Sequence, residues 1–395
     1  MDMPFGVLND RLAEAALLSG TPLNGQLELT PRCNYRCRMC YVNQAAGDER
    51  IRTRELPAVE WLRIGRGFRD MGMLNVLLTG GEPFLRPDFL PLYADLHDLG
   101  LVMTVFTNAS LVTPQAAAAL ARRRPHAVYV SLYGATDAVS DSVTGCRDSL
   151  TKTLEGVRCL RAARIPVILR TTLVRQNQAQ LGQMAAIAES FGVPFGMNEL
   201  LFSRRDPLPE NVQAGSAPSA DWRLDAEEME QVLQAFGERL AGRDSGRAQL
   251  VTTDVGARRR HTEPGSAFTC SAARTSFWVT WDGMLTPCAS LRTPSVRLEG
   301  LGMREAWEQL RQGCAAVPAC EACLSCPDRE FCETCPAYSF AETGRFDLPA
   351  PFLCERYKGR HTHHDGMSPG AVRSSVLTKA DDGRLAYRSN YVETD

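Results

Sequence analysis

The chain has 395 residues, of which 44% are hydrophobic, 23% are charged and 7% are aromatic. This composition is typical of a globular protein and excludes a disordered chain, a collagen-like repeat and a simple coiled coil. Because 44 Lys and Arg residues nearly balance 46 Asp and Glu residues, neither nucleic acid nor a membrane surface is expected as a partner.

Residues 1–24 are expected to be an N-terminal extension to the main fold. They have no basic segment followed by a long apolar run, so they do not form a secretory signal. No stretch of the chain approaches the roughly 18 apolar residues that a membrane span requires. We therefore expect a cytoplasmic protein, in which clustered cysteines bind metal or serve redox chemistry rather than form disulfides.

Residues 25–203 alternate between short apolar runs rich in β-formers and longer stretches of helical periodicity. Strands are expected at 25–30, 75–80, 101–107, 126–132, 166–173 and 194–202. Helices are expected near 55–71, 87–99, 113–124, 147–164 and 178–191. This alternation predicts the α/β class, with a parallel sheet that forms a partial, open (β/α)6 barrel similar to a TIM barrel. In such folds the functional site lies at the carboxyl ends of the strands.

The rest of the chain has less regular periodicity. Residues 204–224 are rich in Pro, Ser, Ala and charge, which is typical of a linker. Residues 225–356 are expected to form a second, cysteine-rich domain, with helices near 225–242 and 302–312. Metal-bound cysteines could supply the cross-links that such a segment needs to hold its shape. Residues 357–395 are expected to be a polar tail, which includes His361, His363 and His364.

The 14 cysteines are unevenly spread, with three between positions 33 and 40 and nine between 270 and 354. The first group is Cys33-x3-Cys37-x2-Cys40, directly after the first expected strand. Three thiolates on one tight loop can bind three corners of a cubane iron–sulfur cluster and leave the fourth iron without a protein ligand. The alternative is a zinc site, but zinc needs a fourth ligand and the next histidine in the chain is His97.

This cysteine loop resembles the CxxxCxxC signature of the radical S-adenosylmethionine (radical SAM) enzymes, which stands at the end of the first barrel strand. The sequence TGGEP at 79–83 follows the second strand and is similar to the GGEP-like residues of that family. The resemblance implies that Gly80 and Gly81 let the backbone approach the methionine part of S-adenosylmethionine (SAM). It also implies that Glu82 accepts hydrogen bonds from the ammonium group of SAM. By itself, Gly-Gly-Glu-Pro would indicate only a turn.

Polar residues at later strand ends resemble further cofactor contacts of the family. The residues so implied are Thr107, Asn108 and Ser131, with Asn108 and Ser131 directed to the ribose and carboxylate of SAM. Two positions depart from the family pattern. Ser140 stands where a histidine is usual, and Met39 replaces the aromatic residue often found between the second and third cysteines. Tyr41 could pack against the adenine instead.

The second group of cysteines resembles the SPASM extension of radical SAM enzymes, CX9–15GX4C followed by CX2CX5CX3C and a final C. Here twelve residues separate Cys270 from Gly283, and four residues separate Gly283 from Cys288. The spacing before Cys335 is x2 rather than x3, and Cys314 and Cys320 are additional. The SPASM extension binds two auxiliary [4Fe–4S] clusters. The alternative is a zinc-ribbon-like module, which explains the CxxC pairs but not the Gly-x4-Cys element.

The resemblance implies a set of ligands for each auxiliary cluster. The first cluster would be held by Cys270, Cys288 and Cys335. The second would be held by Cys323, Cys326, Cys332 and Cys354. Because the first set is one ligand short, Cys320 could supply the fourth thiolate, or the iron could be open to a substrate thiol or to water. Cys146 and Cys159 are expected to be ordinary thiols, although Cys146, on the rim of the site, could donate a hydrogen atom to a substrate radical.

The resemblance covers residues 25–356 and implies an activity. A reduced [4Fe–4S] cluster would cleave SAM to a 5′-deoxyadenosyl radical, which abstracts hydrogen from an unactivated C–H bond. Because SPASM enzymes mostly modify peptides, we expect a ribosomally synthesised peptide as substrate and a crosslink, an oxidation or an epimerisation as the reaction. The auxiliary clusters would accept the electron left after substrate oxidation or bind the substrate directly.

Other functions are weighed against this one. The main alternative is a radical SAM dehydrogenase of a small-molecule metabolite. An anaerobic sulfatase maturase is disfavoured because Ala289 stands where those enzymes usually carry an aspartate base. An iron–sulfur electron carrier or a zinc-binding module would have no need of the SAM-binding residues.

The resemblance implies an electron donor as a partner and leaves open whether a second protein recognises the peptide leader. Only 32 residues precede Cys33, too few for the leader-binding domain that many such enzymes carry, so either a separate leader-recognition protein or the barrel itself would bind the leader. An electron donor such as flavodoxin or ferredoxin would reduce the cluster.

Overall fold

The computed structural model describes residues 5–42, 44–203, 221–241, 250–251, 266–359, 376–379 and 385–388. Most of the predicted linker and the three histidines of the predicted tail lie outside these ranges. The fold is organised around one ten-stranded sheet with the order β12-β11-β10-β1-β4-β5-β6-β7-β8-β9. No helix in the described part of the chain is long and apolar enough to cross a bilayer.

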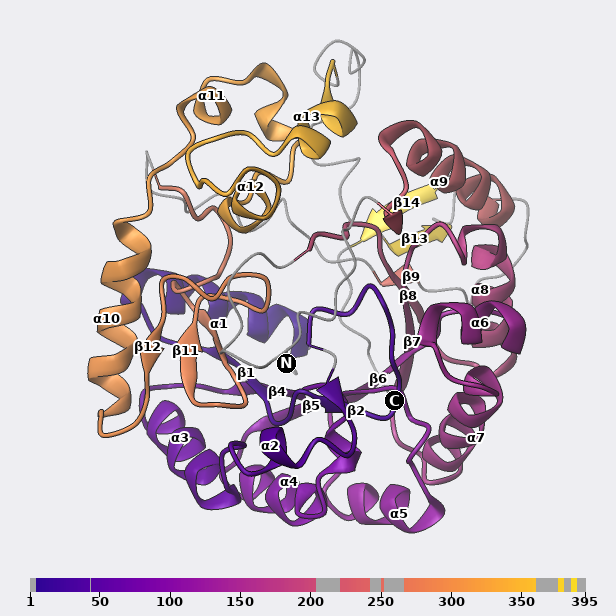
Figure 1. Cartoon of the computed structure of the whole chain (residues 1–395), viewed down its shortest axis with the longest axis horizontal. Coiled ribbons are helices and arrows are strands. Elements are labelled where there is room, and N and C mark those ends of the chain that lie inside the picture. Colours follow the sequence, from indigo (N-terminus) through magenta and orange to yellow (C-terminus); the bar gives the residue numbers. More distant parts are fainter. Residues whose placement is uncertain are drawn as a thin grey trace.

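The six predicted barrel strands are present in the predicted order, and each is parallel to the next. They are β1 (Asn24–Glu28), β4 (Asn75–Thr79), β5 (Val102–Thr107), β6 (Ala127–Ser131), β7 (Val167–Thr172) and β8 (Phe195–Asn198). The helices between them lie around the outside of the curved sheet (Figure 1). They are α3 (Ala58–Asp70), α4 (Phe89–His97), α5 (Pro114–Arg122), α7 (Ser149–Ala162) and α8 (Leu181–Ser190), which follows the short η2 (Gln178–Gln180). The prediction of an α/β partial barrel is confirmed.

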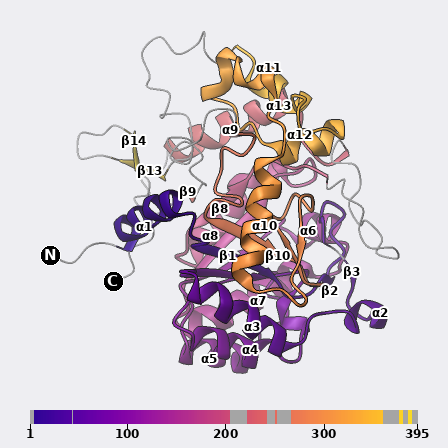
Figure 2. The same ribbon diagram turned by 90° about the vertical axis from the view of Figure 1, so that its left-hand side faces the viewer.

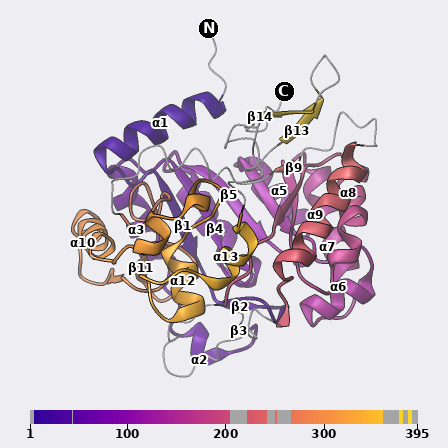
Figure 3. The ribbon, with the colours of Figure 1, turned by 90° about the horizontal axis from the view of Figure 1, so that it is seen from above.

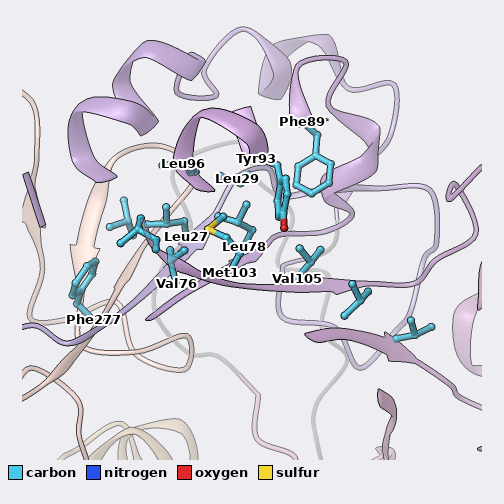
Figure 4. Packing of buried hydrophobic residues seen from close by; sticks show 14 of the residues in the cluster. Leu27, Leu29, Val76, Leu78, Phe89, Tyr93, Leu96, Met103, Val105 and Phe277 are labelled. Atoms are coloured by element: carbon cyan, nitrogen blue, oxygen red, sulfur yellow. The ribbon is translucent and has the colours of Figure 1, made fainter. Parts of the chain in front are cut away.

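The core of the barrel lies between the sheet and its outer helices. Leu27, Leu78 and Val105, on three neighbouring strands, are fully buried there beneath the helices (Figure 4). Burying a leucine-sized side chain stabilises a fold by about 1.5–3 kcal/mol. Because side chains alternate along a strand, Glu28 and Thr79 face the opposite way, into the interior of the barrel.

Several elements near the N-terminus were not predicted. The extension 1–24 contains α1 (Phe5–Ser19), and the cysteine loop carries β2 (Arg32–Cys33), β3 (Gln44–Ala45) and α2 (Glu49–Arg52). Figures 2 and 3 show α1 at one end of the barrel and β2, β3 and α2 at the other. The cysteine loop therefore lies at the carboxyl ends of the strands, where the sequence placed the site.

The predicted second domain extends the barrel sheet at its β1 edge. β10 (Ser276–Val279) pairs with β1 in parallel, and Gly25 lies opposite Phe277. β11 (Met284–Thr286) and β12 (Val296–Arg297) continue the sheet with antiparallel pairing. At the far edge, β9 (Leu250–Val251) pairs with β8.

The helices of the C-terminal half follow these strands. The predicted helices 225–242 and 302–312 correspond to α9 (Ala226–Ala241) and α10 (Met303–Ala315). The cysteine-rich segment adds α11 (Glu321–Leu324), η5 (Pro327–Glu330), α12 (Pro336–Thr343) and α13 (Pro351–Tyr357). Three of these, α11, α12 and α13, gather at the top of Figure 1. In the predicted tail, β13 (Val376–Lys379) and β14 (Leu385–Arg388) form an antiparallel pair.

Candidate active site at the carboxyl ends of the strands

The three cysteines predicted to bind iron share one tight loop. The Cys40 backbone N–H donates to the Cys37 carbonyl (3.1 Å), and the Tyr35 backbone N–H donates to Cys33 Sγ (3.3 Å). Burial raises the pKa of the Cys37 thiol well above its ordinary value, and the neighbouring Cys40 and Cys33 raise it further. Burial also raises the pKa of Cys33, with the charge of Glu82 adding to the effect. The three thiols are therefore close neighbours in a water-poor setting.

The donor set of the loop fits an iron–sulfur cluster. All fourteen cysteines lie in the described part of the chain, and none of them forms a disulfide. Three thiols on one loop suit a cluster in which each thiolate binds a different iron.

A buried ion-pair network fixes the strand that leads into this loop. Arg32 donates to both carboxylate oxygens of Glu55, at 2.7 and 3.0 Å, and Thr30 also donates to Glu55. Arg86 lies against the same carboxylate and donates to the Leu29 carbonyl (2.9 Å). The Arg32, Glu55 and Arg86 side chains are at most 7% exposed. No sequence motif marks these three residues, and an isolated charge in a sequence does not show that it is buried.

The glycines of TGGEP bring two backbone segments together. Gly81 N–H donates to the Thr30 carbonyl (2.7 Å), and Glu82 N–H donates to the Arg32 carbonyl (2.9 Å). A Cβ atom at Gly81 would lie 2.3 Å from the Arg32 carbonyl oxygen, and one at Gly80 would lie 2.3 Å from that of Thr30. In this structure the absent side chains therefore let the turn dock on the strand before the cysteines. The approach of the same glycines to SAM stays a prediction.

The Glu82 carboxylate is fully buried and joins two strand ends. It accepts hydrogen bonds from Thr107 Oγ1 (2.8 Å), the Asn108 backbone N–H (2.8 Å) and the Phe84 backbone N–H (3.1 Å). Burial outweighs these donors and raises the pKa of Glu82 to about 7. A buried carboxylate of this kind is stabilised by a cation placed beside it.

Asn108 holds the cysteine loop. Its side-chain amide donates to Asn34 Oδ1 (2.9 Å) and Cys33 Sγ (3.7 Å), and its carbonyl oxygen accepts from the Ser110 backbone N–H (2.9 Å) and hydroxyl (2.6 Å). These bonds use all four hydrogen-bonding positions of the amide group. Any contact of Asn108 with a cofactor would have to replace one of them.

The next two strands present a hydroxyl and a cation at the same end of the sheet. Ser131 ends β6, lies opposite Arg170 of β7 and is near enough to Tyr133 to lower the pKa of its hydroxyl. Burial raises the pKa of Tyr133, and the nearby Cys37 raises it further, so this tyrosine lies close to the cysteine loop. The Arg170 guanidinium stands 5.8 Å from the centre of the Phe106 ring. Arg170 was not singled out from the sequence, although an arginine inside an apolar strand was a usable signal.

Tyr41 and Met39 make different contacts. Tyr41 makes an edge contact with Trp278 of β10, with ring centres 6.5 Å apart, and Trp278 Nε1 donates to Glu28 (3.1 Å). Met39 is buried in a small apolar cluster with Tyr35, Cys37, Val143, Val174 and Trp222. The first contact ties the cysteine loop to the C-terminal half, and the second covers the loop with apolar side chains.

Ser140, which stands where the family usually carries a histidine, lies within α6 (Asp137–Thr144). Ser140 is buried there and hydrogen-bonded to Ser149 (2.7 Å), and Asp141 accepts from Ser149 at the start of α7. Just after α6, Cys146 Sγ donates to the Asn34 carbonyl (3.2 Å). The structure thus places Cys146 against the cysteine loop, while Cys159 packs on α7 against the main core.

The cysteines of the C-terminal half lie near one another in space. Burial raises the pKa of Cys335, and Cys270 and Cys288 raise it further, so these three thiols lie near one another. Burial raises the pKa of Cys323, and contacts with Cys320, Cys354 and Cys332 add to it. Cys320 therefore lies beside the second predicted set.

Residues 27–187 match the model of the Radical SAM superfamily. This stretch contains the cysteine loop, the GGEP turn and the polar ends of β5 and β6, and it is a radical SAM domain. The prediction of a radical SAM enzyme is confirmed at the level of this domain. The superfamily uses SAM and a [4Fe–4S] cluster, which are the cofactors that the donor set fits.

Curated relatives match about half of the chain. A PqqA peptide cyclase from Bradyrhizobium diazoefficiens is 32% identical over 41% of this chain and 42% of its own length. The mycofactocin maturase MftC from Mycobacterium tuberculosis is 31% identical over 55% of this chain and 53% of its own length. The chain thus spans about half the length of these relatives.

Solved structures share the fold over most of the chain. SuiB of Streptococcus suis, bound to S-adenosylmethionine, gives a TM-score of 0.66 at 18% identity and covers 90% of this chain and 83% of its own. Native anSMEcpe with bound AdoMet gives a TM-score of 0.63 at 14% identity and covers 85% of this chain and 95% of its own. These similarities confirm the radical SAM fold.

Proposed function

We propose that this protein is an enzyme that uses SAM and a [4Fe–4S] cluster to modify a ribosomally synthesised peptide. The observation that carries the proposal is the loop of Cys33, Cys37 and Cys40 at the carboxyl end of β1, packed against Glu82 and Asn108. When bound, the cluster and SAM supply a 5′-deoxyadenosyl radical that can remove a hydrogen atom from a C–H bond.

The side chains around the loop have distinct tasks in binding. Cys33, Cys37 and Cys40 hold three irons as thiolates, which requires each thiol to lose its proton on binding. Glu82 offers its remaining acceptor position to the SAM ammonium, which would favour the charged form of the carboxylate. The Ser131 hydroxyl and the Arg170 guanidinium, paired across β6 and β7, suit the SAM carboxylate. Tyr41 is the residue proposed to pack on the adenine.

The apolar cluster on the loop protects the chemistry from water. Tyr35, Met39 and Trp222 are each less than 9% exposed and cover the cysteine side of the site. A reactive radical would otherwise be lost in side reactions, so exclusion of water and oxygen is one of the protein's main contributions.

The choice of a peptide substrate is supported by the relatives. One is named a PqqA peptide cyclase, another a mycofactocin maturase, and SuiB has also been crystallised with its precursor peptide SuiA. By the same reasoning, we propose a crosslink, an oxidation or an epimerisation as the reaction. We also propose two auxiliary [4Fe–4S] clusters in the C-terminal half, a flavodoxin or ferredoxin as electron donor, and recognition of the leader by a separate protein or by the barrel.

Two measurements on the anaerobically reconstituted protein test the proposal. Dithionite and SAM should yield 5′-deoxyadenosine, detected by mass spectrometry, and co-expression with a short peptide encoded beside the gene should change the mass of that peptide. Cys159→Ala, which alters a thiol outside all three cysteine sets, should behave like wild type. Absence of 5′-deoxyadenosine would contradict the proposal. Its formation without any change in the peptide would favour a dehydrogenase of a small molecule.

A further inference from the structure

Cys314 is a buried thiol that the sequence motifs leave without a role. It lies at the C-terminal end of α10 and is 6% exposed. The preceding residue, Gly313, packs so closely on Pro294 that a Cβ atom there would lie 2.9 Å from Pro294 Cβ. Pro294 belongs to the segment between β11 and β12, which begins with the turn of Cys288 and Leu291. The end of α10 is therefore held against the segment that carries Cys288.

The two further segments, which carry Cys270 and Cys335, lie beside each other. The residues that precede them are in contact, because the Thr269 hydroxyl donates to the Thr334 carbonyl (3.5 Å). Cys335 caps the N-terminus of α12, and both cysteines pack against the hydrophobic cluster that includes Cys314. The four thiols come from four separate segments, and each belongs to the main hydrophobic cluster or packs against it.

We propose that Cys314 is the fourth ligand of the first auxiliary [4Fe–4S] cluster, together with Cys270, Cys288 and Cys335. The inference rests on the iron–sulfur chemistry of the proposed function and is independent of the peptide substrate. It assigns the position that the family motif leaves open, and it uses a cysteine that lies outside that motif.

Electrostatics supports this grouping. Burial raises the pKa of Cys314 to about 12, and the thiols that raise it further are Cys288 and Cys270. The same two thiols raise the pKa of Cys335. Four thiolates this close would repel one another strongly in a buried site, and the irons of a cluster supply the positive charge that offsets the repulsion.

Cys320, the other unassigned cysteine, belongs with the second set. It lies close enough to Cys323 and to Cys354 to raise the pKa of both thiols. The Cys323 backbone N–H donates to the Cys320 carbonyl (3.0 Å) at the start of α11. Cys320 was the thiol suggested from the sequence for the first cluster, and these contacts favour Cys314 in its place.

The assignment has a consequence for the chemistry of the first auxiliary cluster. With four thiolates from the protein, each iron has a protein ligand and no corner is left for a substrate thiol or for water. Direct binding of the peptide to this cluster is then excluded. Only the cluster on the Cys33–Cys40 loop keeps an iron without a protein ligand.

The test uses a full-length variant in which Cys33, Cys37 and Cys40 are all alanine, so that only auxiliary clusters contribute to its spectra. After anaerobic reconstitution, we measure iron, acid-labile sulfide and the EPR spectrum of the reduced protein, with and without added cyanide. The same measurements are made on four variants of this parent, each with one further substitution. Two of them carry Cys314→Ala or Cys314→Ser, and the two matched controls carry Cys320→Ala or Cys159→Ala. Cyanide serves as a probe for an iron that lacks a protein ligand.

The expected result is a parent variant whose spectrum does not respond to cyanide. If the first cluster is lost, Cys314→Ala should contain about half of the parent's iron, because one of two [4Fe–4S] clusters is missing. If the cluster is retained with an open iron, the spectrum of Cys314→Ala should change when cyanide is added. Cys314→Ser, which keeps the size of the side chain, should alter the spectrum even if the alanine variant does not fold. In the two control variants the first cluster should behave as in the parent.

Three results would overturn the assignment. One is a Cys314→Ser variant with the parent's iron, sulfide and spectrum. Another is a parent variant that already responds to cyanide, and the third is a parent variant that holds zinc without iron. The proposed function is tested separately, because formation of 5′-deoxyadenosine by the otherwise unaltered chain does not depend on which thiol completes the first auxiliary site.

Discussion

The barrel loop of residues 33–40 and the C-terminal segment of residues 314–354 both carry cysteines, but they are built differently. The barrel loop rests on a buried scaffold, in which Glu82 binds two strand ends and Glu55 binds Arg32. In the C-terminal segment, the helices after α10 have four, eight and seven residues. Helices of that length are marginal without tertiary support. The comparison indicates that the protein itself shapes the barrel site, and we expect the proposed auxiliary clusters to fix the shape of the C-terminal sites.

One cluster of side chains joins the two regions. The Arg223 guanidinium lies 3.7 Å from the centre of the Phe352 ring and 5.0 Å from that of Phe202, and it donates to Glu342 (2.7 Å). Glu342 also accepts from the Phe352 backbone N–H (3.0 Å). The base of α13 is thereby tied to the segment that follows β8, so the C-terminal segment has a fixed point on the barrel.

The largest expected effect is on SAM cleavage, which should depend on the cysteines of the barrel loop but not on those of the C-terminal segment. Cys37→Ala should abolish formation of 5′-deoxyadenosine, because two thiolates cannot hold a cluster with a single open corner. Cys326→Ala should leave measurable SAM cleavage but no modified peptide. Both products are quantified by mass spectrometry of the same reactions. Full yield of modified peptide from Cys326→Ala would show that the second auxiliary site is dispensable.

Removal of metal should affect the two regions unequally. After chelation under anaerobic conditions, amide hydrogen exchange should rise by orders of magnitude over residues 314–357, because the cross-links between the short helices are lost. Strands β1, β4, β5 and β6 should keep their protection. Equal loss of protection in barrel and C-terminal segment would refute the idea that only the latter depends on metal.

A third prediction concerns the scaffold of the barrel loop. Glu55→Ala should lower the free energy of unfolding by about 3–5 kcal/mol, because it leaves the buried Arg32 charge without its partner. The matched control is Glu60→Ala, which breaks a surface pair with Arg63 and should cost about 0–1 kcal/mol. Denaturant titration of both variants measures the difference, and similar losses would show that the Arg32–Glu55 pair is not a scaffold.

The smallest expected effect is on SAM affinity. Glu82→Gln should weaken binding about 10- to 100-fold, the effect of losing one hydrogen bond between charged groups. Burial raises the pKa of Glu82 to about 7, so in wild type the carboxylate loses its charge, and SAM binding weakens, as the pH falls through that value. Calorimetry of the iron-loaded protein at pH 6 and pH 8 should show weaker SAM binding at pH 6 in wild type. Glu82→Gln should lack this part of the pH dependence. The same pH dependence in both proteins would mean that Glu82 does not contact the ammonium.

The sequence was most informative where apolar periodicity and motif order coincide. Runs such as NVLLTG and HAVYVSL predicted buried parallel strands, and the polar residues after them were predicted at one end of the sheet, where Glu82 and Asn108 lie. The pairing of β10 with β1 was not predicted, because the run from Ser276 to Val279 is short and its partner lies some 250 residues earlier.

Single residues were harder to assign than elements. Asn108 matched a family position, but only the structure shows that its amide is used to hold the cysteine loop. Arg32 and Glu55 carry no motif, and their importance follows from burial, which a sequence does not record. Cys314 lies at a buried position of an amphipathic helix, where a small apolar residue would serve as well, so its proximity to Cys270 and Cys288 emerged only in three dimensions.

EPR spectroscopy of the dithionite-reduced protein tests most directly whether the barrel loop leaves one iron free for SAM. Addition of SAM should change the spectrum of a single [4Fe–4S] cluster, and that component should vanish in Cys37→Ala while the auxiliary signals stay. A spectrum that SAM leaves unchanged, or a preparation that contains zinc without iron and sulfide, would contradict the account.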